Sequence, residues 1–69
     1  MEHTPVTSSV ILSVGYDAET QVLEVEFIRG AVYQFSGVPR EVYDGILVAD
    51  SKGKYFHANI KNIYSFLKL

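Results

Sequence analysis

Apolar and polar residues alternate along residues 22–35, whose sequence is VLEVEFIRGAVYQF. Leu23, Val25 and Phe27 alternate with two glutamates, which is the period of two expected of a half-buried strand. A second alternation begins at Ala31. The pattern therefore predicts two strands joined by a tight turn, and the register of this hairpin decides which side chains form the core.

The length of the turn fixes that register. A two-residue loop at Arg29-Gly30 places Phe27 opposite Val32 and mixes carboxylates into the aromatic face. A three-residue loop over Ile28, Arg29 and Gly30 makes one face wholly apolar, with Gly30 in the left-handed position of a G1 bulge. Its pairs are Phe27 with Ala31, Val25 with Tyr33 and Leu23 with Phe35. We predict the bulged register, because a one-residue slip would turn the apolar set outward.

A third strand is predicted before the hairpin. Its inward apolar positions are Val10, Leu12, Val14 and Tyr16. A four-residue turn over residues 17–20, with the Asp17 carboxylate accepting backbone N–H bonds, joins it to the hairpin. Val14 then pairs with Leu23, and Leu12 with Val25. The opposite face, formed by Ile11, Ser13, Glu24, Glu26 and Gln34, is mixed and is expected to remain solvated.

Helical spacing replaces the alternation after Pro39, which ends the sheet and suits the first position of a helix. The spacing predicts a helix over residues 40–49. Gly45 costs about 1 kcal/mol inside a helix, so we expect close packing of this helix on the sheet. Ser51 is a plausible N-cap for a second helix that continues to about Tyr64. Its apolar stripe is Phe56, Ile60, Ile63, Tyr64 and Leu67.

These elements predict an α+β fold in the order β-β-β-α-α: a three-stranded antiparallel meander with two C-terminal helices packed on one face. The 69 residues make one domain, spanning residues 1–69. Residues 1–5 are expected to be frayed, with His3 a solvated side chain.

The composition excludes several kinds of chemistry. The chain has no cysteine, which removes disulfides, thiol catalysis and zinc-thiolate sites. No nucleophile elbow, acid–base pair or set of metal ligands has a telling spacing, so we predict no enzyme, cofactor or metal site. No apolar run of about 18 residues and no leader are present, and we expect a soluble, cytoplasmic protein with no membrane partner.

Charged residues are divided unevenly along the chain. Residues 1–50 hold all eight acidic side chains and only two basic ones, Arg29 and Arg40. Residues 51–69 hold four lysines and no acid. Such a split is typical of an end that binds anions or nucleic acid. It is equally typical of an internal dipole, in which the basic tail lies across the acidic sheet.

The segment Ser51-Lys52-Gly53-Lys54 is the first candidate contact site. Lysines in the first turn of a helix oppose the macrodipole at a cost of about 0.3–1 kcal/mol. A bound phosphate would be held by free N–H groups, the Ser51 hydroxyl and both ammonium groups, and Gly53 would let it approach closely. The spacing of a P-loop is absent, so nucleotide hydrolysis is not predicted. A capped helix start with two solvated lysines explains the same residues.

Aromatic and basic residues follow immediately and extend the candidate surface. Aromatic rings beside lysines can stack the bases of a single-stranded nucleic acid. Phe56 belongs to the core stripe, which leaves Tyr55 and His57 as the rings available for stacking. Core or solvated roles explain these residues equally well. The candidate contact residues are Ser51, Lys52, Gly53, Lys54, Tyr55, His57 and Lys61.

Several segments, taken in order, resemble the KTSC domain from about Val6 to Tyr64. They are SSVILSVGYDAETQVLEVEF, GAVYQFSGVP, VYDGILVADSKGKYF and the region from Ile60 to Tyr64. That small domain is named for its occurrence at the C-terminus of some lysyl-tRNA synthetases, and it also occurs as a stand-alone bacterial protein. The resemblance implies an uncharacterised domain for which the synthetase association favours RNA binding. The usual central Tyr-x-Tyr stands here as Tyr33-Gln34-Phe35, and the predicted register points both rings toward the core.

Three functions of different classes follow. The first is a non-catalytic binding module whose basic C-terminal part contacts RNA or another polyanion. The second is a protein-interaction or assembly module that pairs with a protein partner, or forms a homodimer, through a sheet edge at residues 31–36 or 10–16. The third is a site for a small phosphorylated ligand.

Overall fold

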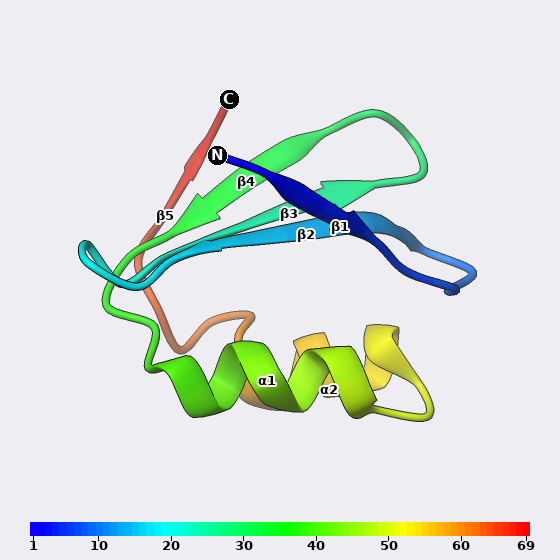
Figure 1. Cartoon of the computed structure of the whole chain (residues 1–69). Coiled ribbons are helices and arrows are strands. Elements are labelled where there is room, and N and C mark those ends of the chain that lie inside the picture. Colours follow the sequence, from blue (N-terminus) through cyan, green and yellow to red (C-terminus); the bar gives the residue numbers. More distant parts are fainter.

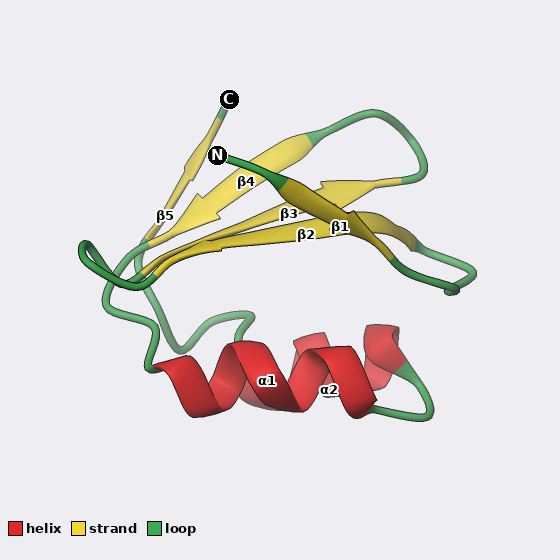
Figure 2. Cartoon of the chain, viewed as in Figure 1, coloured by secondary structure: helices red, strands yellow, loops and turns green.

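The computed structural model describes all of residues 1–69 and has two layers, a five-stranded antiparallel sheet and two helices that cover one of its faces (Figures 1 and 2). The strands are β1 (His3–Pro5), β2 (Ile11–Asp17), β3 (Val22–Phe27), β4 (Val32–Phe35) and β5 (Phe66–Lys68), in the spatial order β1-β2-β3-β4-β5. The helices are α1 (Arg40–Val48) and α2 (Lys52–Asn59). The predicted α+β class is confirmed, but the three-stranded sheet is wrong because both ends of the chain add a strand.

The β3–β4 hairpin has the predicted bulged register. Leu23 pairs with Phe35, and Val25 pairs with Tyr33. The backbone N–H of Phe27 donates to the carbonyl of Ala31 at 2.9 Å, which closes the three-residue loop. Gly30 has a φ of 102°, the left-handed conformation that a side chain would strain. The apolar pattern alone was sufficient to choose between the two registers.

The β2–β3 pairing differs from the predicted one by two positions. Val14 lies opposite Val25 rather than Leu23, because the turn occupies residues 18–21 and Gln21 adopts a φ of 56°. Asp17 accepts the N–H of Glu19 at 3.0 Å, as expected of the turn. A shift of two positions keeps the same side chains on each face of the sheet, so the core is unchanged by it.

A bulge near the start of β2 exchanges two residues between the faces. Ile11 lies opposite Phe27 and Ser13 opposite Glu26, which leaves Leu12 as the extra residue. Ile11 is fully buried and Leu12 is 47% exposed. The prediction had placed Leu12 inward and Ile11 outward, and it is wrong because period-two alternation carries no information about an inserted residue.

The N-terminal residues are paired rather than frayed. β1 runs antiparallel to β2, with His3 opposite Gly15 and Pro5 opposite Ser13. The side chain of His3 is hydrogen-bonded on the open face of the sheet, where no helix lies. The expectation of a loose terminus is therefore wrong, because side-chain contacts to β2 and β3 hold a strand of only three residues.

The second helix is shorter than predicted. The N–H of Ile60 donates to the carbonyl of Phe56 at 3.0 Å in the last turn, and Asn62 then adopts a φ of 65° that reverses the chain. The last residues form β5 beside β4. Ile63 and Leu67, which the helical stripe included, are 58% and 62% exposed.

The free edges of the sheet are therefore β1 and β5. The edges proposed from sequence, residues 10–16 and 31–36, belong to β2 and β4, each of which is paired on both sides. The expectation is wrong because both terminal segments, which sequence periodicity left outside the sheet, occupy those edges.

The core lies between the sheet and the helices. Its nine buried apolar residues are Ile11, Val14, Leu23, Val25, Phe35, Val38, Ile46, Phe56 and Ile60. Gly45 packs against α2 rather than against the sheet, because a Cβ at this position would overlap the ring and hydroxyl of Tyr55. That hydroxyl donates to the carbonyl of Val42 at 3.1 Å and joins the two helices. Neither helix has the length and apolar character needed to cross a membrane.

Candidate nucleic-acid interface

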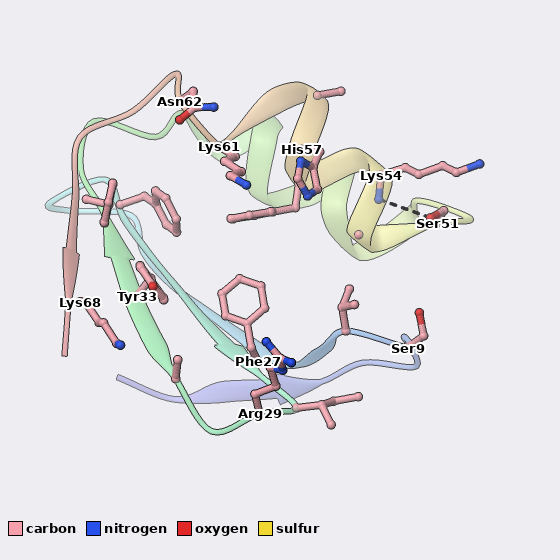
Figure 3. A pocket seen from close by; sticks show the side chains of 18 residues that line it. Ser9, Phe27, Arg29, Tyr33, Ser51, Lys54, His57, Lys61, Asn62 and Lys68 are labelled. Atoms are coloured by element: carbon pink, nitrogen blue, oxygen red, sulfur yellow. Dashed lines mark hydrogen bonds between the residues drawn. The ribbon is translucent and has the colours of Figure 1, made fainter.

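An open groove of about 1300 Å³ runs between α2 and the part of the sheet formed by β3, β4 and β5 (Figure 3). Its 18 lining residues include four of the six basic side chains of the chain and none of the eight acidic ones. The four cations are Arg29, Lys54, Lys61 and Lys68. The groove is therefore the place where the positive charge of this acidic protein gathers.

The cations come from four separate places along the chain. Arg29 stands on the β3–β4 turn, Lys54 in α2, Lys61 just after α2, and Lys68 in β5, and all four are exposed. Figure 3 shows Lys61 and His57 on the helix side of the groove, and Arg29 and Lys68 on the sheet side. Charges of one sign on both walls, with no carboxylate between them, attract an extended anion more than a single small one.

Aromatic rings form the floor of the groove. Phe56 of α2 meets Phe27 and Phe35 of the sheet edge-to-face, with ring centroids 5.3 and 5.5 Å apart. Such arrangements stabilise beyond the area they bury, by roughly 0.5–1.5 kcal/mol per pair. Phe35 and Phe56 are 2% and 8% exposed, so they fix α2 on the sheet and offer little surface to a ligand.

Two further rings, on β4 and on the edge strand β5, line the groove. Phe66 of β5 is 60% exposed, and its centroid is 5.4 Å from that of Tyr33, which is half-buried in β4. Lys68 lies directly opposite Tyr33 in the β4–β5 pairing. The sequence prediction pointed both rings of the Tyr33-Gln34-Phe35 motif toward the core. Both rings do so, since Phe35 is 2% exposed and Tyr33 packs half-buried against the core, and both rings also line the groove.

Five of the seven residues proposed from sequence line the groove, namely Ser51, Gly53, Lys54, His57 and Lys61. The Ser51 hydroxyl accepts the backbone N–H of Lys54 at 3.3 Å, which confirms the N-cap. Gly53 has a packing role, since a Cβ there would lie 2.8 Å from a methyl group of Val10. The close approach that Gly53 permits is thus taken by a side chain of the protein itself.

Lys52 and Tyr55 do not line the groove. The Lys52 ammonium donates to the carbonyl of Ala49 at 2.9 Å, on the turn between the helices. Tyr55 lies against α1, where its hydroxyl donates to Val42. Lys52 and Tyr55 are three residues apart in α2 and therefore lie on the same face of the helix, where their side chains bond to the turn after α1 and to α1 itself.

The candidate residues proposed from sequence leave out thirteen of the lining residues, among them Arg29, Tyr33, Phe66 and Lys68. Arg29 and Tyr33 lie in the hairpin, about twenty residues before the basic segment that begins at Ser51. Phe66 and Lys68 were placed after a helix rather than in a strand. The charge split indicated the basic end, but only the β4–β5 pairing brings that end beside the hairpin.

A second group of polar side chains lies on the open face of the sheet. The His3 ring nitrogens lie 2.7 Å from the Ser13 hydroxyl and 2.6 Å from a Glu24 carboxylate oxygen. The Ser13 hydroxyl donates to Glu26 at 3.0 Å, and the Gln34 amide donates to Glu24 at 2.6 Å. The hydrogen bonds from Gln34 and His3 lower the pKa of Glu24, although burial opposes the shift.

This network contains a Ser–His–Glu arrangement, but it lacks the features of a nucleophilic site. Ser13 is only 6% exposed, and its proton is directed to Glu26 rather than to His3. The groove, which is the one pocket of the protein, does not include these residues. Gly15 makes the network possible, since a Cβ there would lie 2.8 Å from the His3 ring. The network therefore attaches β1 to the sheet.

The comparisons with known proteins place these features in a family. The sequence model of the KTSC domain matches residues 7–64. An uncharacterised protein of Stutzerimonas stutzeri is 46% identical over 61 residues, which cover 88% of this chain and 86% of that protein. A lysine–tRNA ligase of Nostoc punctiforme is 39% identical over 61 residues, 88% of this chain but 11% of the ligase. The crystal structure of a KTSC domain protein from Yersinia pestis, 39% identical, has a TM-score of 0.93 over 99% of this chain and 96% of that one.

Proposed function

The chain belongs to the KTSC domain family, and on that premise we propose that it is a non-catalytic binding module that holds RNA in the groove between α2 and β3–β5. One observation carries the proposal. Four of the six cations line the groove and all eight carboxylates lie elsewhere. Phosphate contacts by lysine and arginine supply most of the affinity of proteins for nucleic acid.

The placement of the cations and one of the relatives support RNA over a small phosphorylated ligand. The cations stand at four places around an open groove, on α2, on β5 and on two turns, which suits a chain of phosphates better than a single one. A relative in Nostoc punctiforme is by its name an enzyme that ligates lysine to tRNA, so a similar segment lies within a protein that handles RNA.

The test is an amide chemical-shift titration of labelled protein with a short single-stranded RNA. We expect shifts at the groove residues of α2 and β5 and none at α1. If the four groove cations each contact a phosphate, the logarithm of the affinity falls with that of the salt concentration with a slope of about −3. Shifts confined to the open face of the sheet, or binding indifferent to salt, would contradict the proposal.

Charge reversal gives a matched pair of variants. Lys54→Glu/Lys61→Glu reverses two of the groove cations, whereas Arg40→Glu/Lys52→Glu reverses the two cations outside the groove. Both variants change the net charge of the protein by the same amount. We expect the first pair to abolish measurable RNA binding and the second to weaken it only slightly, with both proteins folded by circular dichroism. Equal losses in the two variants would indicate attraction by net charge alone and no groove site.

A second candidate function, assembly through a sheet edge, is favoured by the exposure of β5. Phe66 and Leu67 on this free edge are 60% and 62% exposed. Unprotected apolar edges pair readily with strands of other chains. Light scattering tests it, since an assembly module gains mass with concentration and loses that gain in Leu67→Lys. A mass independent of concentration, with or without the substitution, would exclude self-assembly.

A further inference from the structure

The exposed ring of Phe66 is out of keeping with the rest of the groove. Phe56 packs edge-to-face on Phe27 and on Phe35; Phe35 and Phe56 are buried and Phe27 is half-buried. Phe66 instead presents 60% of its surface to solvent, at the end of the groove where β5 forms the sheet edge. An exposed aromatic in a groove lined by cations is a feature of sites that take planar ligands.

The Phe66 ring contacts the rings of Tyr33 and Phe35 on the neighbouring strand β4. The Phe66 centroid is 5.4 Å from Tyr33 and 5.9 Å from Phe35, with interplanar angles of 48° and 42°. Lys68, two residues after Phe66, lies on the same side of β5 and directly opposite Tyr33. This part of the groove therefore combines one exposed ring, a half-buried ring beside it, and the side chain of Lys68, which lines the same groove.

We propose that this end of the groove selects unpaired nucleic-acid strands by stacking one base on Phe66 while Lys68 holds a neighbouring phosphate. The inference rests on the proposed function and narrows its ligand from RNA in general to strands with accessible bases. A cluster of lysines alone binds any polyanion, whereas an exposed aromatic ring adds affinity only for ligands whose bases can stack on it. Paired bases are stacked within a duplex and cannot reach the platform.

The experiment compares three probes by fluorescence-detected competition at fixed low salt. They are a short single-stranded oligouridine, an inorganic polyphosphate of matched charge that has no bases, and an RNA duplex of matched length. We expect the wild-type protein to bind oligouridine about tenfold more tightly than polyphosphate, because stacking on one ring adds to the phosphate contacts.

Substitutions at position 66 separate stacking from charge. Phe66→Ala is expected to weaken oligouridine binding about tenfold and to leave polyphosphate and duplex binding unchanged. Phe66→Leu keeps apolar bulk in β5 without a flat ring, and we expect the same loss from it. Phe66→Tyr keeps the ring and is expected to bind like the wild type. Leu67→Ala, on the opposite face of the same strand, is the control and should change nothing.

The two proposals fail in different ways. If oligouridine and polyphosphate bind the wild type equally, or if the position 66 variants lose both equally, base stacking on Phe66 is overturned while the basic groove stands. If neither probe binds the wild type, or if Lys54→Glu/Lys61→Glu leaves both affinities intact, the proposed function itself is overturned.

Discussion

Nε2 of His3 lies 2.6 Å from Oε1 of Glu24, although the two residues stand on strands separated by β2. Gly15 lies opposite both of them, so the imidazole ring passes over a position that has no side chain. The other ring nitrogen is 2.7 Å from the Ser13 hydroxyl. This bridge ties the first strand to the centre of the sheet and explains how a segment of three residues remains in place.

Removal of the bridge should release β1 without unfolding the rest of the domain. We expect His3→Ala to cost about 1 kcal/mol of unfolding free energy, because the ring is partly exposed and its bonds exchange in part with water. Amide hydrogen exchange should accelerate in β1 and at the β2 amides that face it, and stay slow in the β3–β4 hairpin. Thr4→Ala, at an exposed position of the same strand, is the control. Uniform acceleration throughout the sheet would show that β1 is not a separate unit.

The lowered pKa of Glu24 predicts how stability depends on acid. Hydrogen bonds from Gln34 and His3 favour the carboxylate, so the folded protein binds the proton less readily than the unfolded chain. The resulting stabilisation is present above the ordinary pKa of 4.5 and is lost as the pH falls through the lowered folded-state value. In urea unfolding measured at several pH values, the free energy of unfolding should fall less steeply at acid pH in Glu24→Gln than in the wild type. The exposed Glu19→Gln variant should keep the wild-type slope, and parallel curves for all three proteins would contradict the assignment.

The bulge in β2 makes neighbouring residues unequal. Ile11 is fully buried and Leu12 is 47% exposed. We expect Ile11→Ala to cost about 2–4 kcal/mol, because it leaves a cavity in the core, and Leu12→Ala to cost less than about 0.5 kcal/mol. Chemical denaturation of the two variants measures both values. A larger loss of stability from Leu12→Ala than from Ile11→Ala would contradict the bulge and favour the regular strand that simple alternation predicts.

Gly45 and Tyr55 are coupled across the helix pair. Gly45→Ala alone should destabilise the protein, because the added methyl overlaps the Tyr55 ring. In a Tyr55→Ala background the ring is absent, and the same substitution should then stabilise by up to about 1 kcal/mol, the difference in helix propensity between alanine and glycine. A double-mutant cycle from thermal or urea unfolding measures this change of sign. If Gly45→Ala changed the stability equally in both backgrounds, the glycine would not be needed to accommodate the Tyr55 ring.

The sequence by itself determined the centre of the domain. Period-two alternation and Gly30 were enough to establish the β3–β4 register, and Ser51 was recognised as a helix cap. Helical spacing located α1 to within a residue or so and the start of α2, but not the end of α2. These features depend on residues close together in the chain, and the free energy that decides them is largely local. The same local signals identified five groove residues that stand on or beside α2.

Tertiary structure alone decided the two outer strands, and with them the groove. His3–Pro5 and Phe66–Lys68 are too short to carry a periodic pattern, and they form strands only because β2 and β4 offer unpaired backbone groups and neighbouring side chains to bind. That pairing brings Phe66 and Lys68 beside Tyr33 and into the groove that Arg29 of the hairpin turn also lines. Both terminal strands pair with the rest of the sheet through contacts between residues distant in sequence. The spacing of apolar residues along the chain does not encode such contacts.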